Sequence, residues 1–342
     1  MEIVSLYLTI SYKQTELIQL TFSGAVNENP NEKAAPASPS LSTIETVTEK
    51  PTVELLPEAA SQAKEPLPEL PYSLRTRKRA IAISWSLLLL DACFLPVGLF
   101  YILKFGAKLD DTRNLGITNS VFGFFSLFQF LFRLWRLLLK SPRYRPVGTT
   151  SRFALDFYQI QFFFGFIVIS VIISIGTAVD PPLLRLLAMP PTALLIQCGP
   201  QLVISCYAVR KGWRAPFRMS STEKGEKVTV ALLTIIEDIV AVEGGGGLEY
   251  RAALKKRYEV SEKFREMLWV LSLIWGVAAV LTAGVTCAVV FTIQKDAAYG
   301  FGWTFPFLWA AGMAVWTIKF VQKRLKEEEE SWEGTTAAAT NE

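Results

Sequence analysis

Long apolar blocks, separated by short polar segments, run along the chain from residue 80 to residue 318. A helix rises about 1.5 Å per residue, so about 20 apolar residues cross a hydrocarbon core roughly 30 Å thick. The pattern therefore predicts an all-α fold, a polytopic membrane helix bundle of about six transmembrane helices. The expected spans are residues 80–103, 115–132, 157–179, 186–209, 268–293 and 299–318.

The polar segments divide the rest of the chain. Residues 1–72 include a long stretch rich in Pro, Ala, Ser, Thr, Glu and Lys. Such a stretch buries too little apolar area to offset its ordering entropy, so we expect a mostly disordered cytosolic tail. Four spans lie in residues 80–209 and two in residues 267–318, with a cytosolic segment at 210–266 and a charged cytosolic tail at 319–342.

Composition and charge support membrane insertion and predict its orientation. Mean hydropathy is +0.31 and charged residues make up 19%, below the roughly 25% of soluble domains. Counted from Arg75 onward with the N-terminus inside, 26 Lys and Arg residues fall on the cytosolic side and 5 on the other. The positive-inside rule therefore predicts that both termini are cytosolic. The pattern does not distinguish the endoplasmic reticulum, another endomembrane or the plasma membrane.

The residue types argue against several kinds of chemistry. The chain has no histidine, and so lacks the commonest general base near neutral pH and the commonest transition-metal ligand. Its four cysteines lie inside apolar blocks without a Cys-x-x-Cys pair, which favours packing over a zinc site or a disulfide framework. We therefore expect no metal and no cofactor, and favour a protein that is not an enzyme.

The segment at residues 210–266 predicts two amphipathic helices joined by a glycine hinge. Apolar residues recur at helical spacing from Val228 to Ile239 and leave Glu237 and Asp238 off that face. A basic second helix follows and is expected to continue directly into the fifth span. Its residues Lys255, Lys256 and Arg257 predict contact with the membrane surface rather than with nucleic acid. A cytosolic or membrane protein that binds residues 228–266 is the alternative partner to the lipid bilayer.

The four glycines between these helices are Gly244, Gly245, Gly246 and Gly247. A phosphate-binding loop would continue with Gly-Lys-Ser or Gly-Lys-Thr, but Leu-Glu follows here. The acidic residues on both sides of the glycines would also repel an anion. We therefore interpret the run as a flexible hinge.

This part of the chain also carries a resemblance. The run IIEDIVAVEGGGG at residues 235–247, followed by YRAALKKRYEVSEKFREML at 250–268, resembles an uncharacterised family of multi-pass membrane proteins of filamentous ascomycete fungi. The similarity covers about residues 145–325. Some proteins of this kind resemble the transmembrane components of indole-diterpene-type pathways, which implies a setting in specialised-metabolite biosynthesis. The resemblance implies no catalytic residues.

Asp91, near the middle of the first expected span, is the candidate for intramembrane chemistry. A carboxylate at the bilayer centre costs about 2.5–3.5 kcal/mol on insertion scales, so it should face the bundle interior. It is expected to be a neutral acid that hydrogen-bonds within the bundle. The alternatives are a proton relay in a transporter and the acid that starts a terpenoid cyclisation.

Span four carries a second candidate, a polar face made by Gln197, Gln201 and Ser205 at four-residue spacing. A helix break at Gly199-Pro200 would free backbone carbonyls, as broken helices do at substrate sites. We interpret span four as a bent packing helix, with a substrate site at this break as the alternative. We expect the remaining polar residues near span ends, Gln129, Asp156 and Gln159, to reach the membrane interface.

Span five carries a stripe of small residues at four-residue spacing, Ala279, Ala283 and Cys287. Such a stripe lets a neighbouring helix approach closely. We interpret it as packing within the bundle, with a homodimer through span five as the alternative.

These observations predict an integral membrane protein that is an accessory or scaffolding component, in a setting such as fungal terpenoid or indole-diterpene-like biosynthesis. The alternatives are a small-molecule transporter that uses Asp91 and a membrane-embedded terpenoid cyclase or transferase.

Overall fold

A computed structural model describes residues 67–68, 70, 94–140, 142–149, 151 and 153–340. Within these residues the chain forms helices and loops without a β-strand, which confirms the predicted all-α class. Five helices are long and apolar enough to cross a membrane. They are α4 (Asp111–Trp135, continued by the π-helix η4, Arg136–Lys140), α5 (Phe157–Thr177), α7 (Pro190–Arg210), α10 (Glu262–Thr292) and α11 (Lys295–Thr340).

These five helices match the second to sixth predicted spans. Most of the first predicted span lies outside the described residues, and its described end forms α3 (Leu95–Tyr101) and the π-helix η3 (Ile102–Gly106). Ion pairs fix this end to the bundle, because Lys104 Nζ lies 2.9 Å from Asp111 Oδ1 and 2.5 Å from Asp296 Oδ1. A single lysine thereby joins α3, α4 and α11.

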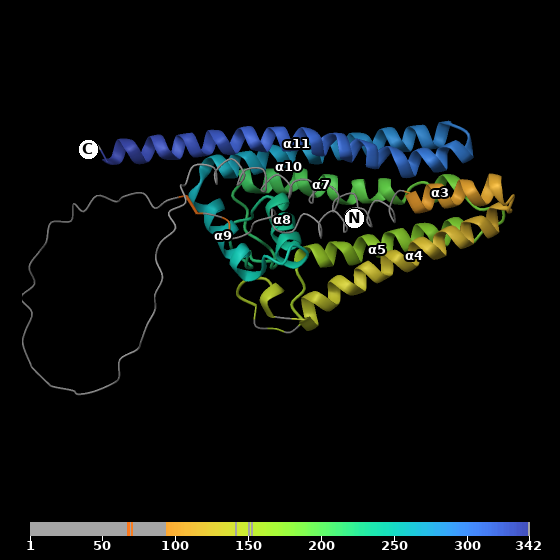
Figure 1. Cartoon of the computed structure of the whole chain (residues 1–342), viewed down its shortest axis with the longest axis horizontal. Helices are drawn as coiled ribbons and strands as arrows, with labels where there is room; N and C mark the ends of the chain where they lie inside the picture. Colours follow the sequence, from red (N-terminus) through yellow and green to blue (C-terminus); the bar gives the residue numbers. More distant parts are fainter. Residues whose placement is uncertain are drawn as a thin grey trace, which may run out of the picture.

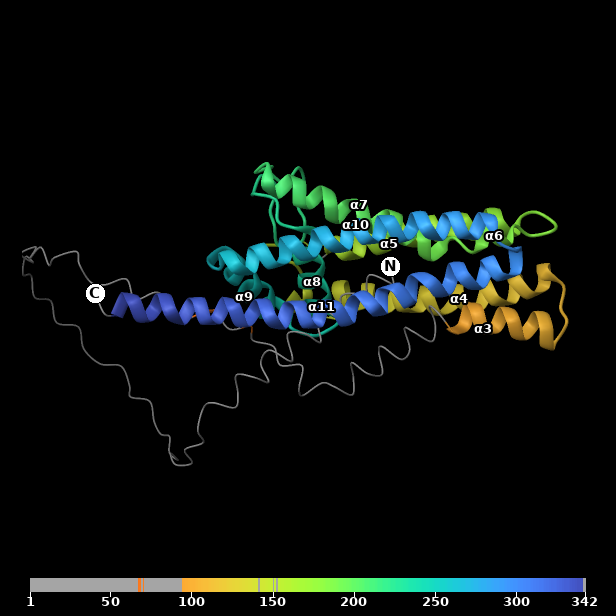
Figure 2. The same cartoon turned by 90° about the horizontal axis from the view of Figure 1, so that it is seen from above.

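Shorter elements close the two ends of the bundle. They are the 3-10 helix η5 (Pro142–Tyr144), α6 (Leu184–Leu187), α8 (Ala231–Val242) and α9 (Gly247–Val260). We call residues 211–260 the cap. In Figures 1 and 2, α8 and α9 lie at the end of the bundle away from α3, and α11 runs along the bundle and continues past the cap.

The cap and the bundle share one hydrophobic core. Its buried members come from all five elements α7 to α11, and α8 is surrounded on nearly every side because ten of its twelve residues are buried. The cap is therefore packed as part of the bundle. The buried core residues include Leu202, Leu232, Ile239, Leu254, Leu268, Trp275 and Leu325.

Helices α7 and α10 approach each other closely through glycines. A Cβ added at Gly199 would lie 3.1 Å from the Gly276 carbonyl oxygen and 3.2 Å from Ala279 Cβ. Ala279 and Ala283 are both buried. The interpretation of the small residues as packing within the bundle is therefore confirmed for these two alanines, while the homodimer stays a prediction.

Two predicted details of the helices are wrong. Helix α7 runs through Pro200 without the predicted break, and proline is tolerated inside membrane-spanning helices. Helix α9 does not continue into α10, because Ser261 takes an extended conformation and its hydroxyl accepts a hydrogen bond from the Phe264 N–H at 3.2 Å. It thus serves as the N-cap of α10.

The charged tail continues the last membrane helix. Helix α11 extends to Thr340, so residues 319–340 are helical. Its charged part contains pairs one helical turn apart, Lys323 with Glu327 at 3.9 Å and Lys326 with Glu330 at 3.7 Å. Pairs at this spacing stabilise a helix by about 0.2–0.5 kcal/mol each.

Candidate functional site

A cluster of buried charged residues lies where the cap meets α4 and α5. We call it the charge network, and its members are Arg133, Asp156, Gln159, Ser220, Ser221, Glu237, Asp238 and Arg251. Every one of them is buried, and none is more than 6% exposed. Buried charges are stable only when they are paired and hydrogen-bonded, so each contact within the network matters to the fold.

Arg133 joins α4 to the start of α5. Its Nη1 and Nη2 atoms donate to the two carboxylate oxygens of Asp156 at 3.1 and 2.8 Å. Nη1 also donates to Gln159 Oε1 at 2.6 Å, and Nε lies 3.2 Å from Glu243 Oε1. The planar guanidinium suits this two-point pairing with a carboxylate.

Arg251 brings α9 into the same network. It is fully buried, and its Nη1 atom donates to Glu237 Oε1 and Asp238 Oδ1, both at 2.6 Å. Its Nη2 atom lies 3.6 Å from Asp156 Oδ2 and donates to the Tyr144 carbonyl at 3.3 Å. Asp156 therefore lies between two arginines, one from the bundle and one from the cap.

The network also satisfies the free N–H groups at the start of α5. Asp156 is the N-cap and accepts from the Gln159 N–H at 2.7 Å. The Tyr158 N–H donates to Asp238 Oδ2 at 3.0 Å, and the Phe157 N–H donates to Ser220 Oγ at 2.9 Å. The first turn of a helix leaves such donors unpaired and carries partial positive charge. One carboxylate and one hydroxyl from the cap thus help to complete a bundle helix.

Two serines contribute hydroxyl groups that hydrogen-bond to the acidic residues of the network. The Ser220 hydroxyl donates to Asp238 and the Ser221 hydroxyl donates to Glu237. Ser221 Oγ also accepts from the Val147 N–H at 3.2 Å. The loop between α7 and α8 is in this way tied to the loop between α4 and α5.

Burial and neighbouring acids perturb Asp238. Burial is the main cause that raises the pKa of Asp238 to about 7, with the carboxylates of Asp156 and Glu237 acting in the same direction and Arg251 opposing them. Burial lowers the pKa of Arg251, but the carboxylates of Asp238, Glu237 and Asp156 outweigh it and raise that pKa above its usual value. The arginine therefore stays charged, while Asp238 titrates near neutral pH.

Part of this network lies deeper in the protein than the sequence predicts. Asp156 and Gln159, predicted to reach the membrane interface, are 0% and 1% exposed. Glu237 and Asp238, predicted to lie off the apolar face of their helix, are also buried. Their positively charged partners lie on other helices, so the spacing along one helix did not reveal them.

The four glycines form an ordered turn between α8 and α9. Gly245 and Gly247 have φ angles of +75° and +63°, which favour glycine. A Cβ at Gly247 would lie 2.7 Å from Arg143 Cγ and 3.2 Å from the Arg143 carbonyl oxygen. Backbone conformation and close packing explain these two glycines, and the flexibility of the turn stays a prediction.

Lys255 and Arg257, which were predicted at the membrane surface, pair with acidic residues of the protein. Lys255 Nζ lies 3.2 Å from Glu226 Oε2, and Arg257 donates to Glu328 on α11 at 2.9 Å. Lys256 is exposed. The pair between Arg257 and Glu328 connects the cap to the part of α11 that continues past it.

The predicted polar face of span four makes contacts inside the bundle. Gln197 Nε2 donates to Gln161 Oε1 at 2.9 Å, and Gln161 Nε2 donates to Gln201 Oε1 at 2.7 Å. Ser205 Oγ accepts from the Ala231 N–H at 3.0 Å. The two glutamines thus join α7 to α5, and the serine caps α8. Asp91 lies outside the described residues.

The part of the chain that the structure describes contains no group of three or more Cys, Asp or Glu side chains arranged to hold a metal ion. No curated protein and no solved structure matches the chain. A comparison with protein families matches residues 57–332 to one described as a domain of unknown function (DUF8766). The match covers most of the 342 residues. The chain therefore belongs to this family of unknown function, and its fold makes it a membrane protein with five described helices able to span a bilayer.

Proposed function

We propose that this protein is an accessory or scaffolding component of a membrane, which holds the cap in a fixed position on the cytosolic side. The charge network is the observation that supports this role. Arg133 and Arg251 hold Asp156 between them, so bundle and cap share one buried carboxylate. The acidic groups of the network are bound to arginines and serines of the same chain. Such an arrangement stabilises a platform rather than offering an acid or base to a substrate.

One face of α9 is suited to present this platform to a protein partner. Glu249, Ala252, Lys256 and Glu259 are exposed and lie on one side of the helix at spacings of three and four residues. The opposite side of α9 is anchored by Tyr250, Arg251 and Leu254, which are buried. A partner would therefore find a helix whose position is fixed before binding, which reduces the entropic cost of association.

The resemblance to fungal membrane proteins suggests where to test this role. The gene would be deleted in its host, and the small-molecule products of the two strains compared. We expect loss or truncation of a terpenoid-type product. Restoration by Asp91→Asn would fit an accessory role, because this change keeps size and hydrogen bonding but removes the titratable proton. If Asp91→Asn does not restore the product although the protein is present at normal abundance, the result would instead favour a transporter or a cyclase.

A surface variant tests the platform directly. Ala252→Arg places a long, positively charged side chain on the exposed face of α9 and leaves the residues of the charge network unchanged. We expect it to reduce product formation while protein abundance stays normal. Lys224→Glu, at an exposed position in the cap loop, is the matched control and should restore the product fully. If Ala252→Arg restores it equally well, this face of α9 does not bind the partner.

The proposed orientation has its own test. A protease added to sealed microsomes should remove an epitope tag fused after residue 342 without detergent. A tag protected until the membrane is dissolved would place the C-terminus, and with it the cap, on the other side.

A further inference from the structure

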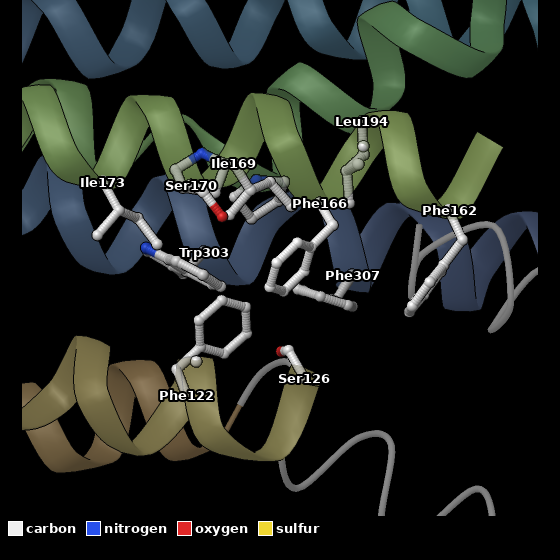
Figure 3. A pocket seen from close by; sticks show the side chains of 14 residues that line it. Phe122, Ser126, Phe162, Phe166, Ile169, Ser170, Ile173, Leu194, Trp303 and Phe307 are labelled. Atoms are coloured by element: carbon white, nitrogen blue, oxygen red, sulfur yellow. The ribbon is translucent and has the colours of Figure 1, made fainter. Parts of the chain in front are cut away.

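An apolar pocket lies inside the bundle between α4, α5, α7 and α11 (Figure 3). The empty space of the pocket, its open side included, is about 670 Å³. All four helices are among those able to span a membrane. The pocket therefore lies at the depth of the lipid chains, and its ligand would come from an apolar phase.

Five aromatic side chains from three helices line the pocket. They are Phe122 on α4, Phe162 and Phe166 on α5, and Trp303 and Phe307 on α11. Figure 3 shows Phe122, Phe166, Trp303 and Phe307 gathered around the same space. Aromatic rings offer large, flat contact surfaces to a ligand.

Neighbouring contacts hold these walls in place. Phe162 and Phe166 both stack on Phe130, with ring centroids 5.5 and 5.9 Å apart. Trp303 meets Phe122 edge-on at 5.1 Å, and its indole N–H donates to the Leu187 carbonyl at 2.9 Å. Walls fixed before binding favour a rigid ligand, because a flexible chain would lose more conformational entropy on entry.

Two serines, Ser126 on α4 and Ser170 on α5, interrupt the apolar surface. Ser126 lines the pocket from α4, is only 7% exposed, and its hydroxyl has no hydrogen-bond partner among the described residues. A serine in a helix can satisfy itself by donating to the carbonyl four residues earlier. Ser120 on the same helix does so, with its hydroxyl 2.7 Å from the Gly116 carbonyl. Ser126 does not, although a buried unpaired hydroxyl costs about 1–3 kcal/mol.

We infer that this pocket binds a rigid, fused-ring apolar molecule with a single hydroxyl or carbonyl oxygen, which hydrogen-bonds with Ser126. The aromatic walls contact the rings, and the serine fixes which end of the molecule enters. Membrane sterols are the readily available compounds of this chemistry. The inference goes beyond the accessory role, and a binding assay on the isolated protein tests it independently of that role.

The test uses the purified full-length protein in lipid nanodiscs with two photoactivatable probes, a diazirine sterol and a diazirine palmitic acid. We expect saturable labelling by the sterol probe at residues of α4, α5 or α11, displaced by unlabelled sterol. Ser126→Ala should weaken this binding about tenfold, as loss of one buried hydrogen bond does. Gly123→Leu should abolish it, because a Cβ at Gly123 meets no atom within 4 Å and the added side chain would fill the pocket.

Two controls lie on the same helix outside the pocket. Ser120→Ala removes an exposed hydroxyl, and Gly116→Leu adds the same bulk at an exposed position where a Cβ also meets nothing within 4 Å. Both should bind the sterol probe like the unaltered protein. Labelling that is not saturable, that survives Ser126→Ala unchanged, or that the control variants reduce equally would overturn the inference. Preferential labelling by the palmitic acid probe would overturn the fused-ring class.

Discussion

Arg133 on α4 and Asp156 at the start of α5 form a buried, two-point ion pair, with nitrogen–oxygen distances of 3.1 and 2.8 Å. The pair closes the connection between two membrane helices. Because Arg251 of the cap also lies 3.6 Å from Asp156, the same carboxylate couples the position of the cap to the spacing of α4 and α5. A substitution on one side of this junction should therefore alter the packing of the other side.

Removal of Arg251 should destabilise the protein strongly. Arg251→Met keeps much of the side-chain volume but leaves Glu237 and Asp238 buried without their cation. Loss of one partner of a buried ion pair typically costs about 3–5 kcal/mol. We expect a clear drop in the melting temperature of the detergent-solubilised protein, together with faster amide exchange in α8, α9 and the first turn of α5.

Lys256→Met provides the matched control for Arg251→Met. It makes the same kind of change on the same helix at an exposed position, where substitutions usually shift stability by less than about 0.5 kcal/mol. Equal melting temperatures for the two variants would mean that the charge network does not hold the cap.

Stability should fall as the pH rises through the range in which Asp238 titrates. Its pKa is about 7 in the folded protein against an ordinary value of 3.8, so between these values the folded state binds more protons than the unfolded state. Linkage then requires stability to decrease from about pH 4 to about pH 7 and to level off above. Melting temperatures measured across this range should show the decline.

Asp238→Asn tests the origin of this slope. Asparagine cannot titrate, so the variant should lose most of the decline between pH 4 and pH 7, whatever its absolute stability. An unchanged slope would assign the pH dependence to another group.

The membrane helices could be predicted from the sequence because hydropathy is a local property. Each long apolar block carries its own signal, and α4, α5, α7, α10 and α11 all lie where that signal placed them. One boundary error could also have been avoided by a local rule, because Ser261 is a good N-cap residue ahead of an apolar run.

The charge network could not be assembled in the same way. Asp156 lies at the end of a span, where a carboxylate facing water is the ordinary expectation, and its two arginines come from other helices. The local signal was the pair Glu237-Asp238 within a helix whose other residues are almost all apolar. A helix of that composition is buried on most sides, so its acids required cations elsewhere in the chain. Nothing in the spacing identified Arg133 and Arg251 as those cations.

Ser205→Ala should loosen the start of α8. The N-cap residue of α8, Val230, has no side-chain acceptor, and Ser205 of α7 supplies one by accepting from the Ala231 N–H at 3.0 Å. Loss of a capping hydrogen bond costs about 0.5–2 kcal/mol. Amide exchange in the first turn of α8 should accelerate, while exchange in α5 should change less. Ser205→Thr keeps the hydroxyl and should behave like the unaltered protein; acceleration by both variants would point to packing instead of capping.

Gly276→Ala should destabilise the bundle, although alanine is the better helix former by about 1 kcal/mol. Its Cβ would lie 2.9 Å from the Gly199 carbonyl oxygen and 2.8 Å from Val203 Cγ2, so α7 and α10 would have to move apart. Overpacking of this kind costs about 1–3 kcal/mol. Gly284→Ala makes the same change on α10 where a Cβ meets nothing within 4 Å, and should leave the melting temperature equal or higher. Because both variants share the gain in helix propensity, the difference between them measures the helix crossing alone. If Gly276→Ala melts at the temperature of Gly284→Ala or above it, close glycine packing between α7 and α10 does not stabilise this bundle.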